Sequence, residues 1–331
     1  MESDNKSEAD SDKACEEMDV RGRDAQSPSQ IPLLGWKDLL WRVWQQAGED
    51  RITLIAAGTT FYLLLALFPT LAAFVSIYGF VADPKTVADH VAFLGGLMPG
   101  GGIDIIRSQL ESLANQDRDA LSIGFLVAVL GAFWSANSGV KTLFEALNIA
   151  YEEREKRSFI KLNLIAFTFT FGAVIIGIFM IVAVGVVPAV LGVLHIDHFS
   201  ETIIAVLRWP LLLIAVAVGI SILYRYGPSR EPAKWRWISW GSGLATVVWM
   251  VASAGFSFYL QNFADYNATY GSLGAVVGLM FWIWISVLIL IVGAELNAEM
   301  EHQTAVDTTT GAPQPMGERG AVVADTLGDA S

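Results

Sequence analysis

Six long apolar stretches dominate this chain of 331 residues. Five of them contain no Asp, Glu, Lys or Arg, and the remaining one is interrupted only by Arg208. A helix needs about 20 apolar residues to cross the ~30 Å hydrocarbon core of a membrane. The chain is therefore predicted to be an all-α, polytopic membrane protein with six transmembrane helices. The stretches are 52–82, 120–140, 162–194, 202–224, 237–264 and 266–294.

The Lys and Arg residues between the apolar stretches predict how the protein is oriented in the membrane. Segments 151–161 and 225–236 carry four Lys or Arg residues each, whereas 195–201 and 265–272 carry none. Because positively charged loops stay in the cytoplasm, the first two segments are expected to be cytoplasmic and the other two to face outward. Six spans then place both termini in the cytoplasm.

These features divide the chain into four regions. Residues 1–31 carry nine acidic and four basic residues, a composition typical of a disordered cytoplasmic tail. Residues 303–331 are also acidic and lack aromatic residues, so a second disordered cytoplasmic tail is expected there. Residues 32–51 are predicted to form an amphipathic interfacial helix, and 52–302 the transmembrane domain. Its spans are expected at about 53–81, 120–150, 162–190, 202–225, 237–261 and 271–298.

The segment before the first span has the pattern of an amphipathic helix. Leu33, Trp36, Leu40, Trp44 and Ala47 share one helical face, with polar residues opposite. A Trp-rich helix of this kind often lies in the plane of the membrane interface. Packing of the helix on the cytoplasmic end of the bundle is the alternative, and the sequence leaves both open.

The first outward loop, 83–119, is too long for a simple connection between two spans. Its apolar residues repeat at helical spacing on both sides of the Gly-rich segment 95–102. Two short helices are therefore expected in this loop, as a cap over the outer face of the bundle.

The second span carries a narrow polar stripe. Asn137, Lys141, Glu145 and Asn148 are spaced by 4, 4 and 3 residues, so they fall within about 80° of a helical wheel. Such a stripe is expected to face the bundle interior or a water-filled cavity. One hypothesis makes it a polar groove used by a substrate. The other makes it a Lys141–Glu145 pair with amide hydrogen bonds that join helices.

Three other residues within the spans are candidates for a role. Arg208 lies near the outer end of the fourth span, where its side chain can snorkel to the interface. Glu295 ends the last span, where it can pair with a base of segment 225–236, pair with Lys141, or serve as an interfacial carboxylate. Pro69 lies in the middle of the first span and predicts a helix kink.

Motifs of soluble enzymes are absent from the sequence. There is no phosphate-binding G-x-x-x-x-G-K-[ST], no nucleophile G-x-S-x-G, no zinc-binding H-E-x-x-H and no C-x-x-C. The outward cluster His195, Asp197 and His198 lacks an evident fourth ligand and is interpreted as a solvated loop. No catalytic residue, metal or cofactor is predicted.

Four segments carry a distinctive combination of residues: AAGTTFYLLLALFPTLAAFVSIYG (56–79), WSANSGVKTLFEALNIAYEEREKRSF (134–159), LYRYGPSREPAKWRW (223–237) and FADYNATYGSLGAVVGLMFWIWISVLILIVGAELNAE (263–299). Their joint order and spacing resemble the YihY/BrkB family of bacterial inner-membrane proteins, formerly labelled ribonuclease BN. The resemblance covers about 35–300. It implies a six-helix protein of the inner membrane without an established activity, in a family linked to serum resistance and to lipid or lipopolysaccharide export.

The expected function is therefore transport, or handling of a lipid or envelope component, across the bacterial inner membrane. The alternative is a non-catalytic structural or partner-binding membrane protein. Ribonuclease activity is not expected, because the only His/Asp cluster faces outward and two acidic tails lie beside the basic loops. The expected partners are membrane lipids and envelope transport proteins, and not nucleic acid. The sequence predicts no oligomeric state.

Overall fold

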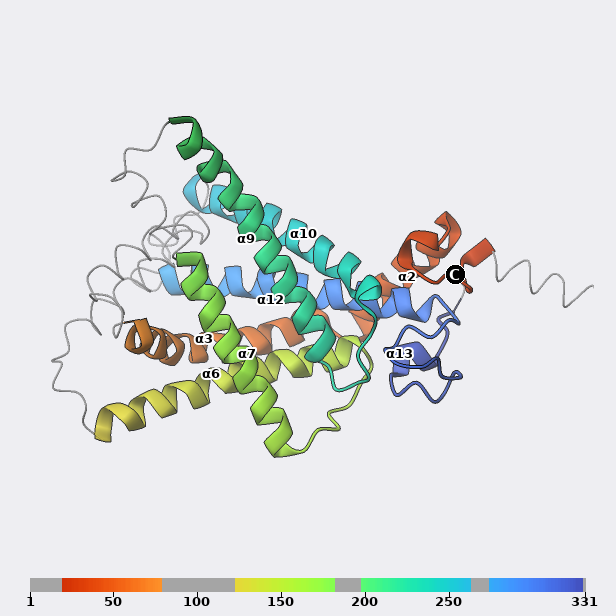
Figure 1. Ribbon diagram of the computed structural model, residues 1–331, viewed down its shortest axis with the longest axis horizontal. Helices are drawn as coiled ribbons and strands as arrows, with labels where there is room; N and C mark the ends of the chain where they lie inside the picture. Colours follow the sequence, from red (N-terminus) through yellow and green to blue (C-terminus); the bar gives the residue numbers. More distant parts are fainter. Residues whose placement is uncertain (1–19, 79–122, 182–197, 263–273, 330–331) are drawn as a thin grey trace, which may run out of the picture.

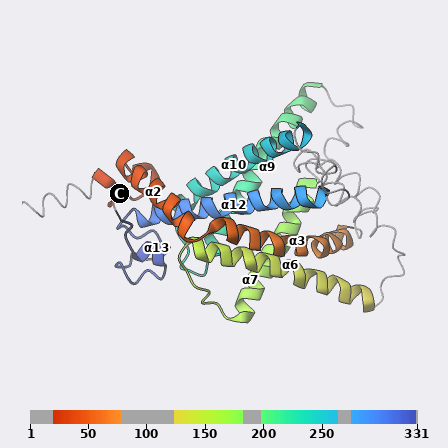
Figure 2. The ribbon, with the colours of Figure 1, turned by 180° about the vertical axis from the view of Figure 1, so that it is seen from behind.

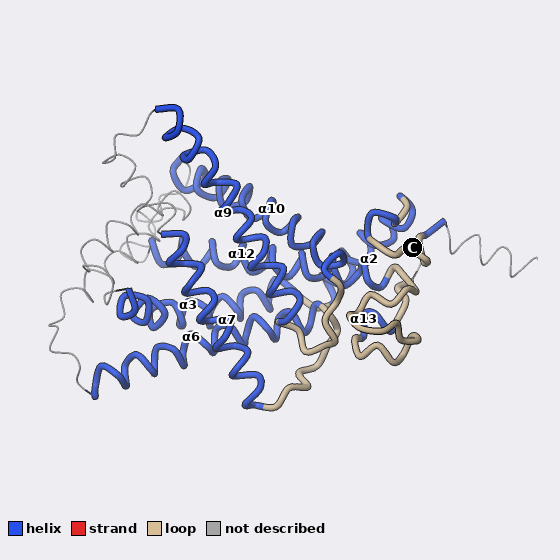
Figure 3. Tube along the Cα trace, viewed as in Figure 1, coloured by secondary structure: helices blue, strands red, loops and turns tan. Residues whose placement is uncertain are grey.

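The computed structural model describes residues 20–78, 123–181, 198–262 and 274–329, which contain helices and loops but no β-strand (Figures 1 and 3). The predicted all-α fold is confirmed. Each apolar stretch of the sequence corresponds to one long helix. The elements are η1 (Pro28–Gln30), α2 (Leu33–Glu49), α3 (Ile52–Tyr78), α6 (Ile123–Ala150), α7 (Phe159–Ile181), α9 (His198–Tyr226), α10 (Trp235–Asn262), α12 (Gly274–His302) and α13 (Val322–Asp325).

Four described helical segments are long and apolar enough to cross a membrane. A fifth span results if α2 and the first part of α3, which meet at 60°, are counted as one bent span. The predicted number of six is not confirmed, because the first two predicted spans extend into residues outside the described ranges. The four segments are Phe159–Gly177, Trp209–Tyr226, Trp235–Leu260 and Val276–His302.

Helix α12 forms the centre of the bundle. It packs against α2, α3, α6, α10 and α13. Figures 1 and 2 show α3 and α6 on one side of α12, with α9 and α10 on the other. Helices α3 and α6 form a close pair, and α7 packs on α6. A central helix with neighbours on all sides must be apolar around its circumference, as the sequence of α12 is from Gly274 to Ala294.

The best-packed part of the core lies at one end of the bundle. This end carries residues 20–31, the α6–α7 loop (151–158), the α9–α10 loop (227–234) and residues 303–329, and we call it the terminal end. Large side chains from several elements are fully buried there. They include Leu147, Tyr151, Tyr224, Trp237 and Ile291.

Two glycines allow α10 and α12 to approach closely at this end. A Cβ atom on Gly241 would lie 2.3 Å from the carbonyl oxygen of Gly293 and 2.4 Å from Oδ1 of Asn297. Both are closer than non-bonded atoms can come. The Gly241 N–H instead donates to Oδ1 of Asn297 at 2.9 Å. The sequence therefore needs glycine at the crossing of these two helices.

Helix α2 packs on the bundle with a face that carries both polar and apolar residues. Asp38 and Leu39 are buried, and α2 contacts α12. On the opposite face, the apolar side chains of Leu33 and Trp44 are 88% and 77% exposed. Packing of this helix on the bundle is thus observed, whereas its position in the membrane interface stays a prediction.

The predicted disorder of the C-terminal tail is wrong for residues 303–329. These residues fold over the terminal end, and Figure 1 shows α13 there beside the end of α12. Hydrogen bonds of polar groups hold the segment. Thr304 donates to the Ala25 carbonyl at 2.7 Å, and the Val322 N–H donates to Glu153 at 2.8 Å. Low hydrophobicity misled the prediction, because buried polar contacts order this segment instead of an apolar core.

Part of the predicted N-terminal tail is folded as well. Residues 20–31 line the same surface, where Arg21 pairs with Asp38 of α2. The Ala305 N–H donates to the Arg23 carbonyl at 2.7 Å, which joins the two terminal segments. Residues 1–19 lie outside the described ranges, as do the predicted short helices within 83–119.

Candidate functional site

Two members of the predicted polar stripe join α6 to α7. Asn137 is fully buried and donates to Oδ1 of Asn163 at 2.8 Å. The Lys141 ammonium donates to the same oxygen at 3.0 Å and lies 5.5 Å from the centre of the Trp134 ring. Sequence reasoning missed Asn163, although a lone amide in the apolar stretch 162–194 was a usable signal.

The Lys141–Glu145 pair, which was one of the two hypotheses for the stripe, is wrong. Glu145 is exposed, and no ion pair joins it to Lys141 in the described structure. The two residues are one turn apart, but Asn163 on α7 captures the lysine, and Glu145 lies farther around the helix. The stripe is therefore not one continuous polar groove.

Asn148, the last member of the stripe, fixes two loops. Its Oδ1 atom accepts a hydrogen bond from the Ser229 N–H at 2.7 Å, and its Nδ2 atom donates to Glu155 at 3.3 Å. Ser229 belongs to the α9–α10 loop and Glu155 to the α6–α7 loop. These loops contain most of the basic residues that the charge pattern singled out.

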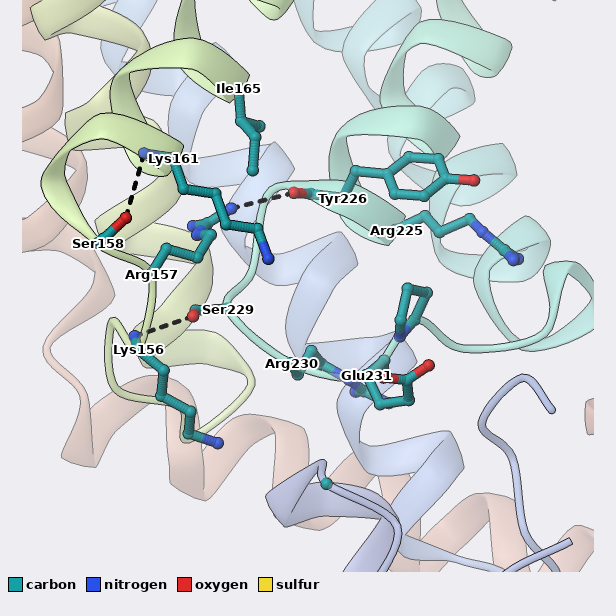
Figure 4. Close-up of a pocket in the computed structure, with 12 residues that line it drawn as sticks. Lys156, Arg157, Ser158, Lys161, Ile165, Arg225, Tyr226, Ser229, Arg230 and Glu231 are labelled. Atoms are coloured by element: carbon teal, nitrogen blue, oxygen red, sulfur yellow. Dashed lines mark hydrogen bonds between the residues drawn. The ribbon is translucent and has the colours of Figure 1, made fainter. Parts of the chain in front are cut away.

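A pocket of about 470 Å³ lies between the two loops at the terminal end (Figure 4). Its lining is strongly basic, with a single acidic residue, Glu231. Helix α7 supplies one wall, the end of α9 another, and Gly320 of the C-terminal segment a third. The basic lining residues are Lys156, Arg157, Lys161, Arg225 and Arg230.

Two of these arginines are structural. Arg157 donates to Glu155 at 2.7 and 2.8 Å and to the Gly227 carbonyl at 2.8 Å, so it ties the two loops together. Burial raises the pKa of Glu155, but the hydrogen bonds from Arg157 outweigh burial and lower this pKa to about 2. Arg230 pairs with Glu301 of α12. Burial lowers the pKa of Arg230, yet Glu301 outweighs burial and raises it.

The other three cationic side chains of the pocket differ in how far their charge is already engaged by other groups. Lys156 pairs with Glu153 at 2.8 Å. The Arg225 guanidinium donates to the Ala233 carbonyl at 2.6 Å and stacks 4.5 Å from the centre of the Trp235 ring. Lys161 is exposed, and no carboxylate in the described structure pairs with its ammonium. Figure 4 shows this ammonium pointing into the pocket, whereas Arg225 points away from it.

This arrangement suits an anionic group. The arginines set the shape of the pocket, and the Lys161 ammonium supplies a charge that is not already neutralised. A lysine acts on phosphate as a mobile point charge, and basic pockets between helices bind lipid headgroups. No group of three or more His, Cys, Asp or Glu residues in the described ranges could hold a metal ion.

The remaining predicted residues lie elsewhere. Glu295 is buried beside Asp50, at the junction of α2 and α3, and pairs with neither Lys141 nor the α9–α10 loop. Helix α3 continues through position 69, but the side chains of Pro69 and Arg208 are outside the described part of the structure. Of the predicted cluster His195, Asp197 and His198, only the backbone of His198 is described, at the start of α9.

The long apolar helices and the basic loops at one end define a polytopic helical membrane protein. The chain belongs to the family described as Virulence factor BrkB, which it matches over residues 43–317. The family predicted from the sequence is thereby confirmed.

Several relatives have been described from bacteria. The chain is 29% identical to a ribonuclease-like protein, YfkH of Bacillus subtilis (strain 168), over 79% of its own length and 93% of that protein. It is 26% identical to a UPF0761 membrane protein of Cronobacter sakazakii, over 81% of this chain and 89% of that protein. It is also 26% identical to the UPF0761 membrane protein RSc1559 of Ralstonia nicotianae, with 77% of this chain and 57% of that protein covered. No solved structure matches the chain.

Proposed function

We propose that this protein handles an anionic lipid or envelope component at the bacterial inner membrane, and that its headgroup binds in the basic pocket. The observation that carries the proposal is the position of the Lys161 ammonium. It points into a pocket of about 470 Å³, and no carboxylate among the described residues pairs with it. The pocket lies at the ends of apolar helices, where a lipid headgroup would be found. Partners in this proposal are membrane lipids, with envelope transport proteins as candidates.

The orientation in this proposal places the terminal end in the cytoplasm. Lys and Arg residues are concentrated in the loops of this end, which supports a cytoplasmic position by the positive-inside rule. Anionic headgroups of the cytoplasmic leaflet would then lie level with the pocket. The protein acts without catalytic residues in this proposal.

Native mass spectrometry of the full-length protein tests the headgroup site. The protein is released from nanodiscs that contain phosphatidylglycerol and phosphatidylcholine, and the lipids that stay bound are counted. Lys161→Gln should reduce retained phosphatidylglycerol several-fold and leave phosphatidylcholine unchanged, because it removes the free charge without touching the arginine frame. Lys37→Gln is the matched control, since Lys37 is an exposed lysine on α2 outside the pocket. Equal loss in both variants would contradict the proposal.

A second candidate function is a structural or partner-binding role without a transported substrate. The contact of Asn137 and Lys141 with Asn163 favours it, because these polar groups bond to each other and so act as connections between helices. In that case Lys161→Gln would leave lipid retention unchanged, and the protein would be recovered with a partner from cross-linked membranes.

A further inference from the structure

Two carboxyl groups, that of buried Glu295 and that of half-buried Asp50, meet where α2, α3 and α12 come together. Glu295 lies on α12 and is 1% exposed, and Asp50 follows the last residue of α2. The two carboxyl groups lie within hydrogen-bonding reach of each other. No donor among the described residues bonds either carboxyl oxygen of Glu295 or the Oδ2 atom of Asp50. Glu295 therefore faces the Asp50 carboxyl rather than a cation, and Asp50 lies beside both Glu295 and the Gln46 side chain.

Two polar groups beside the pair form an independent part of this site. The Tyr151 hydroxyl and the Nδ2 atom of Asn297 are buried and make no standard hydrogen bond within the described structure. Asn297 is held in place because its Oδ1 atom accepts from the Gly241 N–H. Asn297 lies within hydrogen-bonding reach of Tyr151, and the charge of Glu295 acts on Tyr151 after those of Glu301 and Arg230. Burial raises the pKa of Tyr151, which keeps the hydroxyl protonated and able to donate.

The charges that act on the pair are predominantly negative. They come from Glu49 of α2, Glu152 after α6 and Glu299 of α12. Two carboxylates close together, one of them fully buried, cannot both ionise cheaply, because the buried charge loses hydration and the two charges repel each other. Additional acidic neighbours increase this cost.

The cations nearest to these acids are already engaged. Arg42 of α2 donates to Glu299 at 2.5 Å, and Nδ1 of His302 lies 3.5 Å from the same carboxylate. Arg51, which follows Asp50, is exposed. Neutralisation of the Asp50–Glu295 pair therefore falls to a proton.

A second pocket is lined by the acidic neighbours of the pair, although neither Asp50 nor Glu295 lines it. Its volume is about 350 Å³, and Glu49, Glu152 and Glu299 line it together with His302. These three carboxylates are also the ones that act on the pair. Carboxylates and a histidine in such a pocket can accept and release protons between the solvent and a buried acid.

We propose that Asp50 and Glu295 form a proton-binding site in which one exchangeable proton is shared between the two carboxyl groups, and that the pocket lined by Glu49, Glu152, Glu299 and His302 is its route to solvent. This site is separate from the basic pocket and does not depend on the headgroup proposal. The shared proton joins the corner between α2 and α3 to the central helix α12. Its loss places two negative charges across that contact.

The local backbone suits such a role. Only Asp50 and Arg51 separate α2 from α3, and Arg51 has a φ of 51°, in the left-handed region. Burial also raises the pKa of Asp50, in agreement with a retained proton. Proton release is therefore expected to loosen the packing of the α2–α3 corner on α12.

Infrared spectroscopy of the full-length protein in nanodiscs tests the proton directly. At pH 7 the wild type should show the carbonyl band of a protonated carboxyl group, and this band should disappear at alkaline pH. Glu295→Gln should abolish the band, and Asp50→Asn should shift its frequency because the hydrogen-bonding partner changes. Glu145→Gln is the control, since Glu145 is exposed and outside the site, and it should leave the band unchanged.

Three results would overturn the proposal. They are a wild type without a protonated carboxyl band at pH 7, a band that neither Glu295→Gln nor Asp50→Asn alters, and a band that Na⁺ removes at constant pH. The last result would assign the site to a metal cation. Each variant is first checked for a single folded peak in size-exclusion chromatography. If Glu295→Gln does not fold, the milder Asp50→Asn exchange tests the proposal alone. A shift in the band frequency then supports the shared proton, and an unchanged frequency contradicts it.

Discussion

Arg230 donates two hydrogen bonds, of 3.0 and 2.6 Å, to the two carboxylate oxygens of Glu301. The side chains are 2% and 0% exposed, and the Arg230 guanidinium also lies 5.0 Å from the centre of the Tyr151 ring. Thr308 of the C-terminal segment donates to the same carboxylate at 2.6 Å. One buried ion pair thus connects the α9–α10 loop, the central helix α12 and the C-terminal segment.

Removal of one member of this pair should destabilise the protein strongly. Arg230→Met leaves the Glu301 charge buried without its partner, which costs about 3–5 kcal/mol in the free energy of unfolding. The double variant Arg230→Met with Glu301→Leu should recover part of this loss, because neither charge is left alone. Thermal unfolding in detergent measures the stability of the single and the double variant. A double variant as unstable as the sum of the single variants would show that the two residues are not coupled.

The pair of Arg157 and Glu155 predicts a pH dependence of stability. The pKa of Glu155 falls from 4.5 to about 2 on folding, so the folded state favours the carboxylate. Its contribution is present above pH 4.5 and is lost as the pH falls towards about 2. Glu155→Gln should therefore lower the unfolding temperature at pH 7 and reduce its decline between these pH values. The effect should be small, because solvent screens this partly exposed pair.

Glu145→Gln is the matched control for that measurement, because Glu145 is an exposed carboxylate outside any ion pair in the described structure. It should leave the pH profile of the unfolding temperature close to that of the wild type. A Glu155→Gln profile that coincides with the Glu145→Gln profile would exclude a stabilising role for the Arg157–Glu155 pair.

Deletion of residues 304–331 should destabilise the protein, contrary to what the sequence alone suggests. It removes the Thr308 hydrogen bond to Glu301 and the Val322 N–H that donates to Glu153, and both acceptors are buried. A buried acceptor without a donor costs about 1–3 kcal/mol. Deletion of residues 1–19 is the control, and it should have little effect if those residues are the disordered tail that the sequence predicts. Equal unfolding temperatures of both truncated proteins would contradict this prediction.

The sequence predicted the helices well because their apolar lengths determine them directly. The basic loops were also predictable, because clusters of Lys and Arg can be read from the sequence without any knowledge of packing. The partners within the site were not predictable. Arg230 and Glu301 are 71 residues apart, and three acidic residues of α12 were equally good candidates before the helix was placed. Glu295 shows the consequence, because it lies beside Asp50, a partner that was not among the three alternatives the sequence left open.

The close crossing of α10 and α12 gives a sharp test of packing. Gly241→Ala places a Cβ atom 2.3 Å from the Gly293 carbonyl oxygen, so the helices must move apart. Overpacking of this kind costs about 1–3 kcal/mol. Gly243→Ala is the matched control on the same helix, because nothing lies within 4 Å of its Cβ position. Only the first variant should lower the unfolding temperature, and equal values would show that this crossing is looser than described.

The last prediction separates the real partner of Lys141 from the one that the sequence suggested. Oδ1 of Asn163 accepts from both Lys141 and Asn137, whereas Glu145 is exposed. Asn163→Leu should therefore leave two donors without an acceptor, at a cost of about 1–3 kcal/mol for each buried group. Lys141→Met should be less costly in the Asn163→Leu background than in the wild type. Lys141→Met and Glu145→Gln should instead be additive, because residues without a shared contact do not couple. The unfolding temperatures of the single and double variants measure the coupling between positions 141 and 163 and that between positions 141 and 145. Coupling of 141 with 145 but not with 163 would contradict the described contacts.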